Sequence, residues 1–163
     1  MKKITITHAG LSDLADIHAI EEEAYPAALA ESAEVLGSRI HVASAFCAVA
    51  LQEDQRVGYV LAHPWTDQSS PGLGRVITKL PTDASVIHIH DLAVLPKMRG
   101  AGVARSMLTW LEQRVEEHGF EAMTLVAVNG ADTFWRTMGF EDIGPADGYD
   151  LQARMMRRIL PGK

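Results

Sequence analysis

Hydrophobic and polar residues follow two different periods along the chain, and these periods predict strands and helices in regular succession. A period of two, or a short continuous apolar run, predicts strands. The predicted strands cover residues 2–9, 45–52, 56–65, 85–95, 122–128, 140–144 and 152–160. Apolar residues at helical spacing predict helices over residues 13–25, 28–43, 103–119 and 131–138. The predicted order is therefore β-α-α-β-β-β-α-β-α-β-β.

Local signals predict where several of these elements begin and end. Ser12 precedes the first helix and is expected to act as its N-cap, and Pro26 ends that helix. Gly119 is a natural C-cap for the third helix. Residues 66–83 are rich in Ser, Gly, Pro and Asp and predict a long loop. Long ordered loops are often functional.

The strand at residues 85–95 has the most continuous apolar pattern and is expected at the centre of the sheet. Strict alternation predicts that His88 and His90 share one face with Leu92 and Val94, and that Asp91 points to the other face. If the strand at residues 122–128 runs parallel to it, the segment between them is a right-handed crossover.

Composition narrows the class of protein. A length of 163 residues, 47% hydrophobic residues and a mean hydropathy of +0.01 indicate one globular domain. The net charge of −6 argues against nucleic-acid binding and is compatible with a cationic substrate. The sequence contains no membrane-length apolar segment and no apparent leader, so we expect no membrane partner and a cytoplasmic location. The single Cys47 excludes an intramolecular disulfide and is expected as a buried thiol.

A basic, glycine-containing loop, "KMRGAGVA", follows the central strand and precedes a helix. Unpaired backbone N–H groups at a helix N-terminus bind anions, and Gly100 and Gly102 allow close backbone approach. The loop lacks the Gly-Lys-Ser/Thr ending of a P-loop and the third glycine of a dinucleotide fingerprint. From spacing alone, an anion site and an ordinary turn are both open.

The spacing Lys97-x-x-Gly100-x-Gly102 resembles the Gln/Arg-x-x-Gly-x-Gly/Ala signature of the GNAT superfamily of N-acetyltransferases, with Lys97 where Gln or Arg is usual. "FWRTMGFEDIG" resembles the closing segment of this family, in which an aromatic pair leads into Gly139-Phe140. The resemblance covers nearly the whole chain. It implies one N-acetyltransferase domain over residues 1–163 with an α/β (α+β) fold: a mixed, mostly antiparallel sheet of six or seven strands with helices on both faces.

The resemblance also implies acetyl-CoA as the cofactor. The backbone from Arg99 to Ala104 would hold the pyrophosphate, and the main chain of Leu92 and Val94 would pair with the pantetheine arm in a splayed gap beside the central strand. Asn129 is one residue closer to Gly139 than is usual for a cofactor contact in the family. The cofactor residues implied in this way are Leu92, Ala93, Val94, Lys97, Met98, Arg99, Gly100, Ala101, Gly102, Val103, Ala104, Asn129, Phe134 and Trp135.

The two histidines have a chemical use in such a reaction. An ammonium group must lose a proton before its nitrogen can attack a thioester, and histidine is well matched to accept that proton near neutral pH. "HIHDLAV" resembles the His-x-His-x-Leu-Ala-Val strand of arylalkylamine N-acetyltransferases, which implies that His88 and His90 act as a base or a proton relay. Zinc binding is the rival interpretation, but no third ligand is evident, so we predict no metal.

Trp135 stands where this family usually has a tyrosine that protonates the leaving thiolate. An indole N–H can donate a hydrogen bond but is not a practical acid. Either Trp135 assists as a donor, or Tyr149 supplies the proton, or activity is weak. Simple packing of Trp135 against the cofactor and core is an equally good interpretation.

The acceptor pocket is expected among the first two helices and the end of the third strand. Its predicted residues are Tyr25, Pro26, Leu29 and Trp65, with Glu22, Glu23 and Glu31 near enough to attract a cation. The predicted activity is acetyl transfer to a primary amine of an arylalkylamine-like or polyamine-like molecule, by a monomer or homodimer. The alternatives are a silent acyl-CoA-binding domain, a peptide or protein N-acetyltransferase, and an interaction module without a cofactor.

Overall fold

The structure, a computed structural model, describes residues 2–150 and 152–161, so the ends of the predicted domain lie outside the described residues. The predicted order of helices and strands is confirmed. The strands are β1 (Ile4–His8), β2 (Ala48–Gln52), β3 (Gln55–Trp65), β4 (Val86–Val94), β5 (Ala122–Ala127), β6 (Glu141–Pro145) and β7 (Arg154–Ile159). The helices are α1 (Leu14–Ala24), α2 (Ala33–Ala43), α3 (Val103–Glu117) and α4 (Asp132–Thr137), with short 3₁₀ turns at Leu11–Asp13, Ser44–Phe46 and Pro96–Met98.

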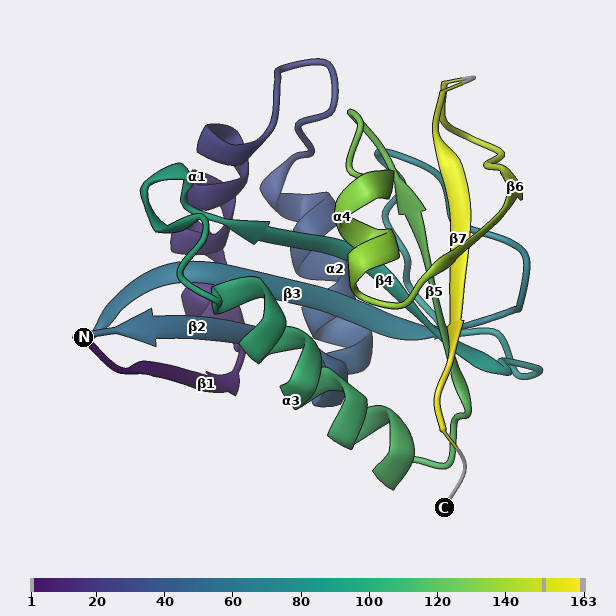
Figure 1. The fold of residues 1–163 in the computed structure, drawn as a ribbon, viewed down its shortest axis with the longest axis horizontal. Coiled ribbons are helices and arrows are strands. Elements are labelled where there is room, and N and C mark those ends of the chain that lie inside the picture. Colours follow the sequence, from purple (N-terminus) through teal and green to yellow (C-terminus); the bar gives the residue numbers. More distant parts are fainter. Residues whose placement is uncertain (1, 151, 162–163) are drawn as a thin grey trace.

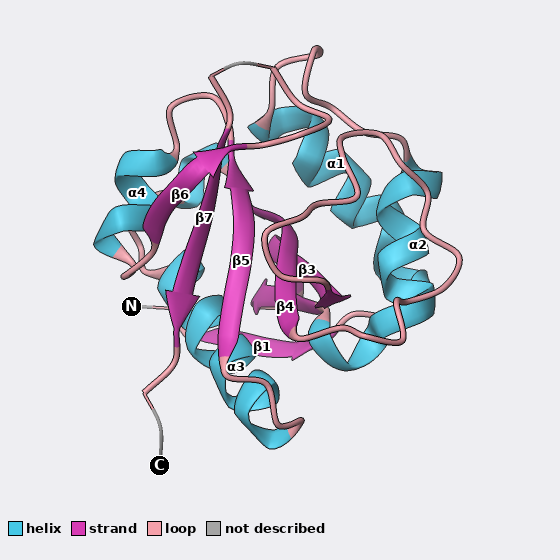
Figure 2. Cartoon of the chain, turned by 90° about the vertical axis from the view of Figure 1, so that its right-hand side faces the viewer, coloured by secondary structure: helices cyan, strands magenta, loops and turns pink. Residues whose placement is uncertain are grey.

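The seven strands form one sheet in the order β1-β2-β3-β4-β5-β7-β6. The pair of β4 and β5 is parallel, and every other neighbouring pair is antiparallel. Helices α1 and α2 cover one face of the sheet, while α3 and α4 cover the other (Figures 1 and 2). This arrangement confirms the predicted mixed, mostly antiparallel sheet with helices on both faces.

The first two helices begin later than the sequence predicts: α1 begins at Leu14 instead of residue 13, and α2 begins at Ala33 instead of residue 28. Ser12 is not an N-cap, because residues 11–13 form a 3₁₀ turn and α1 starts after Asp13. The Asp13 carboxylate instead accepts a hydrogen bond from the Gly10 N–H at 2.8 Å.

Helix α2 contains Gly37 at its contact with α1, where an added Cβ would lie 2.9 Å from a Leu14 methyl carbon. The glycine therefore lets the two helices approach closely.

A β-bulge in β4 overturns the predicted alternation of that strand. Leu61 pairs with Asp91 and Ala62 pairs with Ile89, so His90 is the extra residue. Because one additional residue reverses the alternation beyond it, Asp91 lies on the same face as His88, and Leu92 lies on the opposite face. The prediction that Asp91 points away from the histidines is therefore wrong.

Strands β4 and β5 separate beyond the bulge. Their parallel pairing ends at Ile89 and Leu125, although β4 continues to Val94 and β5 to Ala127. In Figure 1, β2, β3 and β4 run across the view, whereas β5 and β7 lie vertically in opposite directions. The strands diverge at the point where the sequence predicts a splayed gap. The edge of β4 that faces β5 has no strand partner over this stretch of the described chain.

Two further expectations concern the Cys47 thiol and membrane-spanning helices. Cys47 is fully buried just before β2, and burial raises the pKa of its thiol to about 12, so it is not a nucleophile near neutral pH. Among residues 2–150 and 152–161, no helix combines the length and the apolar character that crossing a membrane requires.

Candidate active site

A cavity of about 510 Å³ lies at the separated ends of β4 and β5. It is bounded by the end of α1, the outer part of β4, the loop from β4 to α3, the first turn of α3, and one side of α4. Its lining residues are Ala24, Tyr25, Leu92, Ala93, Val94, Met98, Arg99, Gly100, Gly102, Val103, Ala104, Arg105, Phe134 and Met138. Ten of the residues predicted to contact a cofactor therefore line one cavity: Leu92, Ala93, Val94, Met98, Arg99, Gly100, Gly102, Val103, Ala104 and Phe134.

The glycine loop brings backbone N–H groups to this cavity. Gly100 and Gly102 have φ values of +84° and +81°, and no atom lies within 4 Å of a Cβ built on either residue. Glycine is therefore required here by backbone conformation and not by lack of space. Gly102 caps α3, whose first-turn N–H groups have no intrahelical acceptor. Together with the cationic side chains of Arg99 and Arg105, this end of the cavity suits an anion.

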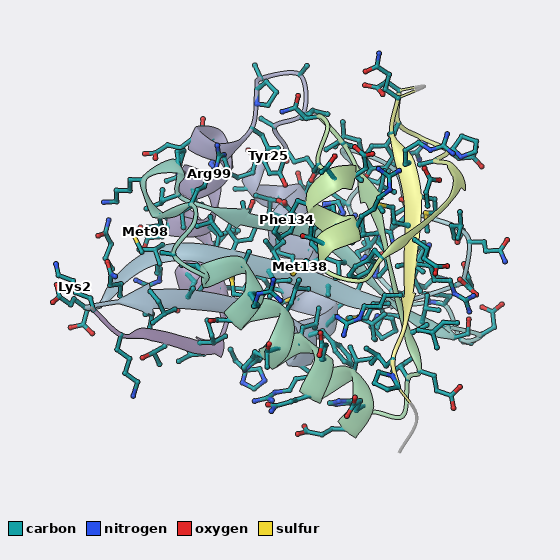
Figure 3. The ribbon with its side chains drawn as sticks, in the orientation of Figure 1. Lys2, Tyr25, Met98, Arg99, Phe134 and Met138 are labelled. Atoms are coloured by element: carbon teal, nitrogen blue, oxygen red, sulfur yellow. The ribbon has the colours of Figure 1, made fainter. Side chains whose placement is uncertain are left out.

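Helix α4 forms the apolar side of the same cavity through Phe134 and Met138, which lie four residues apart and so share one helix face. Figure 3 labels these two side chains together with Tyr25, Met98 and Arg99, which border the cavity from other elements. Met138 was not predicted as a site residue. Its helical spacing from Phe134 is the signal that would have identified it.

The structure does not bring four of the predicted cofactor residues to the cavity. Lys97 and Ala101 are exposed on the loop, and Asn129 is exposed in the turn before α4. Trp135 is 7% exposed and packs edge-on against Phe140, with ring centroids 5.3 Å apart. Trp135 therefore belongs to the main hydrophobic core, and its neighbour Phe134 is the aromatic residue that reaches the cavity.

A second, smaller cavity of about 40 Å³ adjoins the first on the α2 side of β4. Its lining residues are Tyr25, Leu29, Glu31, Leu73, His90, Asp91, Val126, Val128 and Tyr149. Tyr25 lines both cavities, so it marks their junction. The smaller cavity brings together the predicted site residues Tyr25, Leu29, His90 and Tyr149 from three separate parts of the chain.

His90 and Glu31 form a buried pair in this cavity. The His90 Nε2 and Glu31 Oε1 atoms are 2.7 Å apart, and their side chains are 1% and 5% exposed. The other Glu31 oxygen accepts the Gly74 N–H at 2.7 Å. Burial raises the pKa of Glu31, but the hydrogen bond and charge of His90 together with the Gly74 N–H outweigh it, and the pKa is lowered. The His90 Nδ1 atom is buried and has no hydrogen-bond partner in the structure.

Asp91 is the centre of a second buried network. Its Oδ1 atom accepts a hydrogen bond from the Tyr25 hydroxyl at 2.7 Å, and its Oδ2 atom accepts one from the Tyr59 hydroxyl at 2.5 Å. The Tyr25 hydroxyl also lies 3.3 Å from the carbonyl oxygen of Leu92. Burial is the largest influence on Asp91 and raises the pKa of its carboxyl group. None of these contacts could be predicted without the bulge.

His88 lies deeper than His90 and borders neither cavity. It is fully buried, its Nδ1 atom is 2.9 Å from the Thr124 hydroxyl, and its ring centroid is 5.6 Å from that of His63. Burial lowers the pKa of both imidazoles, to about 3 for His63 and well below the ordinary value for His88, so both are neutral near pH 7. His88 therefore belongs to the packed interior of the sheet.

Two predicted acceptor residues lie away from the smaller cavity. Pro26 is exposed in the turn after α1. Trp65 pairs with Val86 at the start of β4, about 13 Å along an extended strand from His90. Of the three predicted glutamates, Glu22 and Glu23 are exposed and only Glu31 reaches the cavity.

The charge around the smaller cavity is negative. Glu31 and Asp91 line it, and Glu21, which is 1% exposed, accepts the Glu31 N–H. Burial raises the pKa of Glu21. The buried cation nearby is Arg39, which donates to the Val35 carbonyl at 3.1 Å and to the Arg75 carbonyl. A cavity with this balance favours a cation over an anion. Within the described residues, no group of three potential ligands could hold a metal ion.

Comparison with known proteins identifies the family. A model of the acetyltransferase (GNAT) family matches residues 14–140. This range includes the "KMRGAGVA" loop, Gly139-Phe140 and most of the residues around the two cavities. The chain belongs to this family. Membership in the GNAT family supports acyl-CoA-dependent acyl transfer as the general activity. No match was found among curated proteins.

Solved GNAT structures share the fold over nearly the whole chain. The loading GNATL domain of CurA from Lyngbya majuscula has a TM-score of 0.84 and 15% identity, covering 96% of this chain and 98% of that one. The GphF GNAT-like decarboxylase in complex with isobutyryl-CoA has a TM-score of 0.80 and 19% identity, covering 96% and 100%. The ribosomal-protein-S18-alanine N-acetyltransferase from Escherichia coli has a TM-score of 0.71 and 17% identity, covering 99% and 96%. At these identities the likeness shows the fold alone.

Proposed function

We propose that this protein transfers an acetyl group from acetyl-CoA to a primary amine whose amino group enters the smaller cavity, with His90 as the base. The observation that carries the proposal is the meeting of two unlike cavities at Tyr25. One is large, apolar and cationic at its loop end, and the other is small and acidic and is lined by His90, whose Nδ1 atom has no hydrogen-bond partner in the structure. The two surfaces match the two substrates of an amine acyltransferase.

The larger cavity fits acyl-CoA on three grounds. The left-handed Gly100 and Gly102 turn and the N-terminus of α3 offer N–H groups to a pyrophosphate. The unpaired edge of β4 offers backbone groups to the amides of a pantetheine arm. Phe134 and Met138 cover the arm from the other side. When bound, acyl-CoA supplies an acyl group that is activated as a thioester.

His90 is the residue best placed to take the proton of the incoming ammonium. Because Nε2 lies against the Glu31 carboxylate, the hydrogen of a neutral imidazole is held on Nε2 and Nδ1 keeps its lone pair. Nδ1 is the buried nitrogen without a partner, and His90 lines the smaller cavity. Glu31 then acts as the positioning residue that fixes the ring and its tautomer.

The acidic surroundings favour an amine that arrives as a cation. Glu31 and Asp91 attract the ammonium group, while Leu29, Leu73 and Val126 offer apolar contact to its carbon chain. The His-x-His strand supports an arylalkylamine-like acceptor, and the negative charge supports a polyamine-like one equally well. His88 and Tyr149 take no proton in this proposal. His88 packs the strand, and Tyr149 borders only the smaller cavity.

A panel of amines tests the proposal. Purified protein is incubated with acetyl-CoA and tryptamine-like, polyamine and peptide acceptors, and free thiol release and acetylated product are measured. Thiol release that depends on one class of amine, and that falls about 100-fold in His90→Gln, is expected. Release no faster than hydrolysis with every acceptor would overturn the proposal.

Decarboxylation of a β-carboxylated acyl-CoA is a second candidate. A cavity of about 40 Å³ has room for about one water molecule, so a reaction that needs only a proton as its second reactant fits it without rearrangement. The likeness in fold to a GNAT-like decarboxylase is a second reason to test for decarboxylation. Carbon dioxide release from such a thioester in the absence of any amine would favour this candidate over amine transfer.

A further inference from the structure

The GNAT position that usually holds an acidic phenol carries Trp135, yet a different phenol stands at the junction of the two cavities. Tyr25 follows directly after α1, and its side chain lines both cavities. Its hydroxyl contacts the Asp91 carboxylate on one side and lies near the Leu92 carbonyl, on the cofactor edge of β4, on the other. No other residue described here lines both cavities.

We propose that Tyr25 and Asp91 form a proton relay that carries a proton from the acceptor amine to the departing thiolate. This inference rests on the proposed acyl transfer and names the residues that complete its proton balance. Tyr25 is the catalytic residue that faces the sulfur, and Asp91 is the group that exchanges a proton with the amine.

The relay accounts for every proton that moves in the reaction. His90 takes the first proton from the ammonium, and the freed nitrogen forms the C–N bond to the acyl carbon. The C–S bond then breaks with its electron pair on sulfur. The nitrogen gives its second proton to Asp91, Asp91 passes a proton to the Tyr25 oxygen, and Tyr25 gives its own proton to sulfur. The products are an amide and a neutral thiol, and Asp91 and Tyr25 return to their starting states.

Other observations agree with these roles. Asp91 is 8% exposed and lines the acceptor cavity, so a proton taken from the amine needs no path through solvent. Its carboxyl pKa is raised by burial, which makes Asp91 a better proton acceptor than an exposed aspartate. The pKa of Tyr25 is raised by burial and by Asp91, so the phenol stays protonated until it receives a proton from Asp91 as it gives one up. Tyr149 borders only the acceptor cavity and is further from this role.

The chain offers a matched control in Tyr59. Its hydroxyl also donates to Asp91, but the residue is fully buried and lines neither cavity. Tyr25→Phe and Tyr59→Phe thus each remove one hydroxyl from the same carboxylate, and only the first removes a group that faces the cofactor cavity.

The first measurement needs no acceptor amine. The ionisation of the thiol of bound CoA is followed by the ultraviolet absorbance of its thiolate, as a function of pH, in the full-length protein and both variants. A hydrogen bond from Tyr25 to sulfur is expected to make the acid dissociation constant of the bound thiol about tenfold larger in the unmodified protein than in Tyr25→Phe. Tyr59→Phe is expected to match the unmodified protein. Equal constants in the unmodified protein and Tyr25→Phe, or an equal change in both variants, would overturn the role of Tyr25.

The second measurement is turnover with the best amine of the panel. Tyr25→Phe is expected to lower kcat about 100-fold with little change in the KM for acetyl-CoA, and Tyr59→Phe to lower it far less. Asp91→Asn, which can still hydrogen-bond both phenols but cannot carry a proton, should lose turnover without making the bound thiol a weaker acid. Full turnover in Tyr25→Phe or Asp91→Asn contradicts the relay. If no amine is acetylated, the proposed function fails, and the thiol titration still decides whether Tyr25 faces the sulfur.

Discussion

Glu31 and His90 meet as a buried pair, with Oε1 and Nε2 only 2.7 Å apart, although they are 59 residues apart in sequence. The pair leaves the Nδ1 atom of the imidazole without a hydrogen-bond partner in the structure, and His90 lines the smaller cavity. Glu31, which the sequence predicts only as one of three glutamates near the acceptor pocket, is therefore the positioning residue that we propose for the base.

This pair predicts a graded loss of activity. Glu31→Ala removes both the charge and the hydrogen-bond acceptor and is expected to lower kcat/KM about 100-fold, while Glu31→Gln keeps an acceptor for Nε2–H and should lose only about tenfold. Glu34→Gln, on the exposed side of α2, is the control and should behave like the unmodified protein. If Glu31→Ala and Glu31→Gln melt at the same temperature and lose the same factor in kcat/KM, Glu31 does not fix the tautomer of His90.

Restoring the usual family residue at Trp135 is not expected to help catalysis. Trp135 lies in the core against Phe140, so Trp135→Tyr places a hydroxyl in apolar surroundings. The free energy of unfolding should fall by about 1–3 kcal/mol, and turnover should not rise. Denaturant melts and steady-state kinetics on the same preparation check both expectations. A several-fold gain in kcat would show that residue 135 reaches the reacting sulfur after all.

The glycine loop predicts a change in affinity that is separable from a change in stability. Gly102 and Gly119 lie at opposite ends of α3 with φ values of +81° and +82°, and neither has an atom within 4 Å of a built Cβ. Alanine at either position should cost about 1 kcal/mol of stability through the left-handed conformation. Only Gly102→Ala should weaken CoA binding in a calorimetric titration, because only Gly102 borders the cofactor cavity. Equal CoA affinities for the two variants would be the contrary result.

The buried histidines predict a loss of stability in mild acid. His63 has a folded-state pKa of about 3 because of burial, against an ordinary value of about 6.5 in the unfolded chain. Between these values the unfolded chain binds a proton that the folded protein does not, so stability falls as pH falls. His63 alone should account for about 2 kcal/mol between pH 7 and pH 5.

This contribution is measured by urea denaturation at both pH values. Three proteins are compared: the unmodified protein, His63→Gln and His41→Gln, of which the last changes an exposed histidine. The drop in stability should be smaller in His63→Gln and unchanged in His41→Gln. The raised pKa values of Asp91 and Glu21 have the opposite effect on the free energy of unfolding. Because the folded protein binds protons at these groups more readily than the unfolded chain does, they add stability as the pH falls. An identical pH dependence in all three proteins would contradict the prediction.

Much of the fold and one half of the site were predictable because they depend on local sequence. The order of elements follows from periodicity. The loop at Gly100 and Gly102 and the helix after it follow from local spacing, and the resemblance to the GNAT family makes this loop a predicted cofactor site. The acceptor half depends on contacts between distant segments. The extra residue at His90 is visible only against the register of β3, and it moves Asp91 to the face where Tyr25 and Tyr59 meet it.

The separation of β4 from β5 has a consequence for how this protein avoids self-association. A strand edge without a partner is ordinarily a hazard, because another chain can add to it and begin an aggregate. Here the unpaired stretch of β4 lies within the sheet, between α1 on one side and α3 and α4 on the other, and it borders the larger cavity instead of the outer edge of the sheet. An unpaired strand edge in this position is open to a ligand in the cavity and is less accessible to another polypeptide than the outer edge of a sheet.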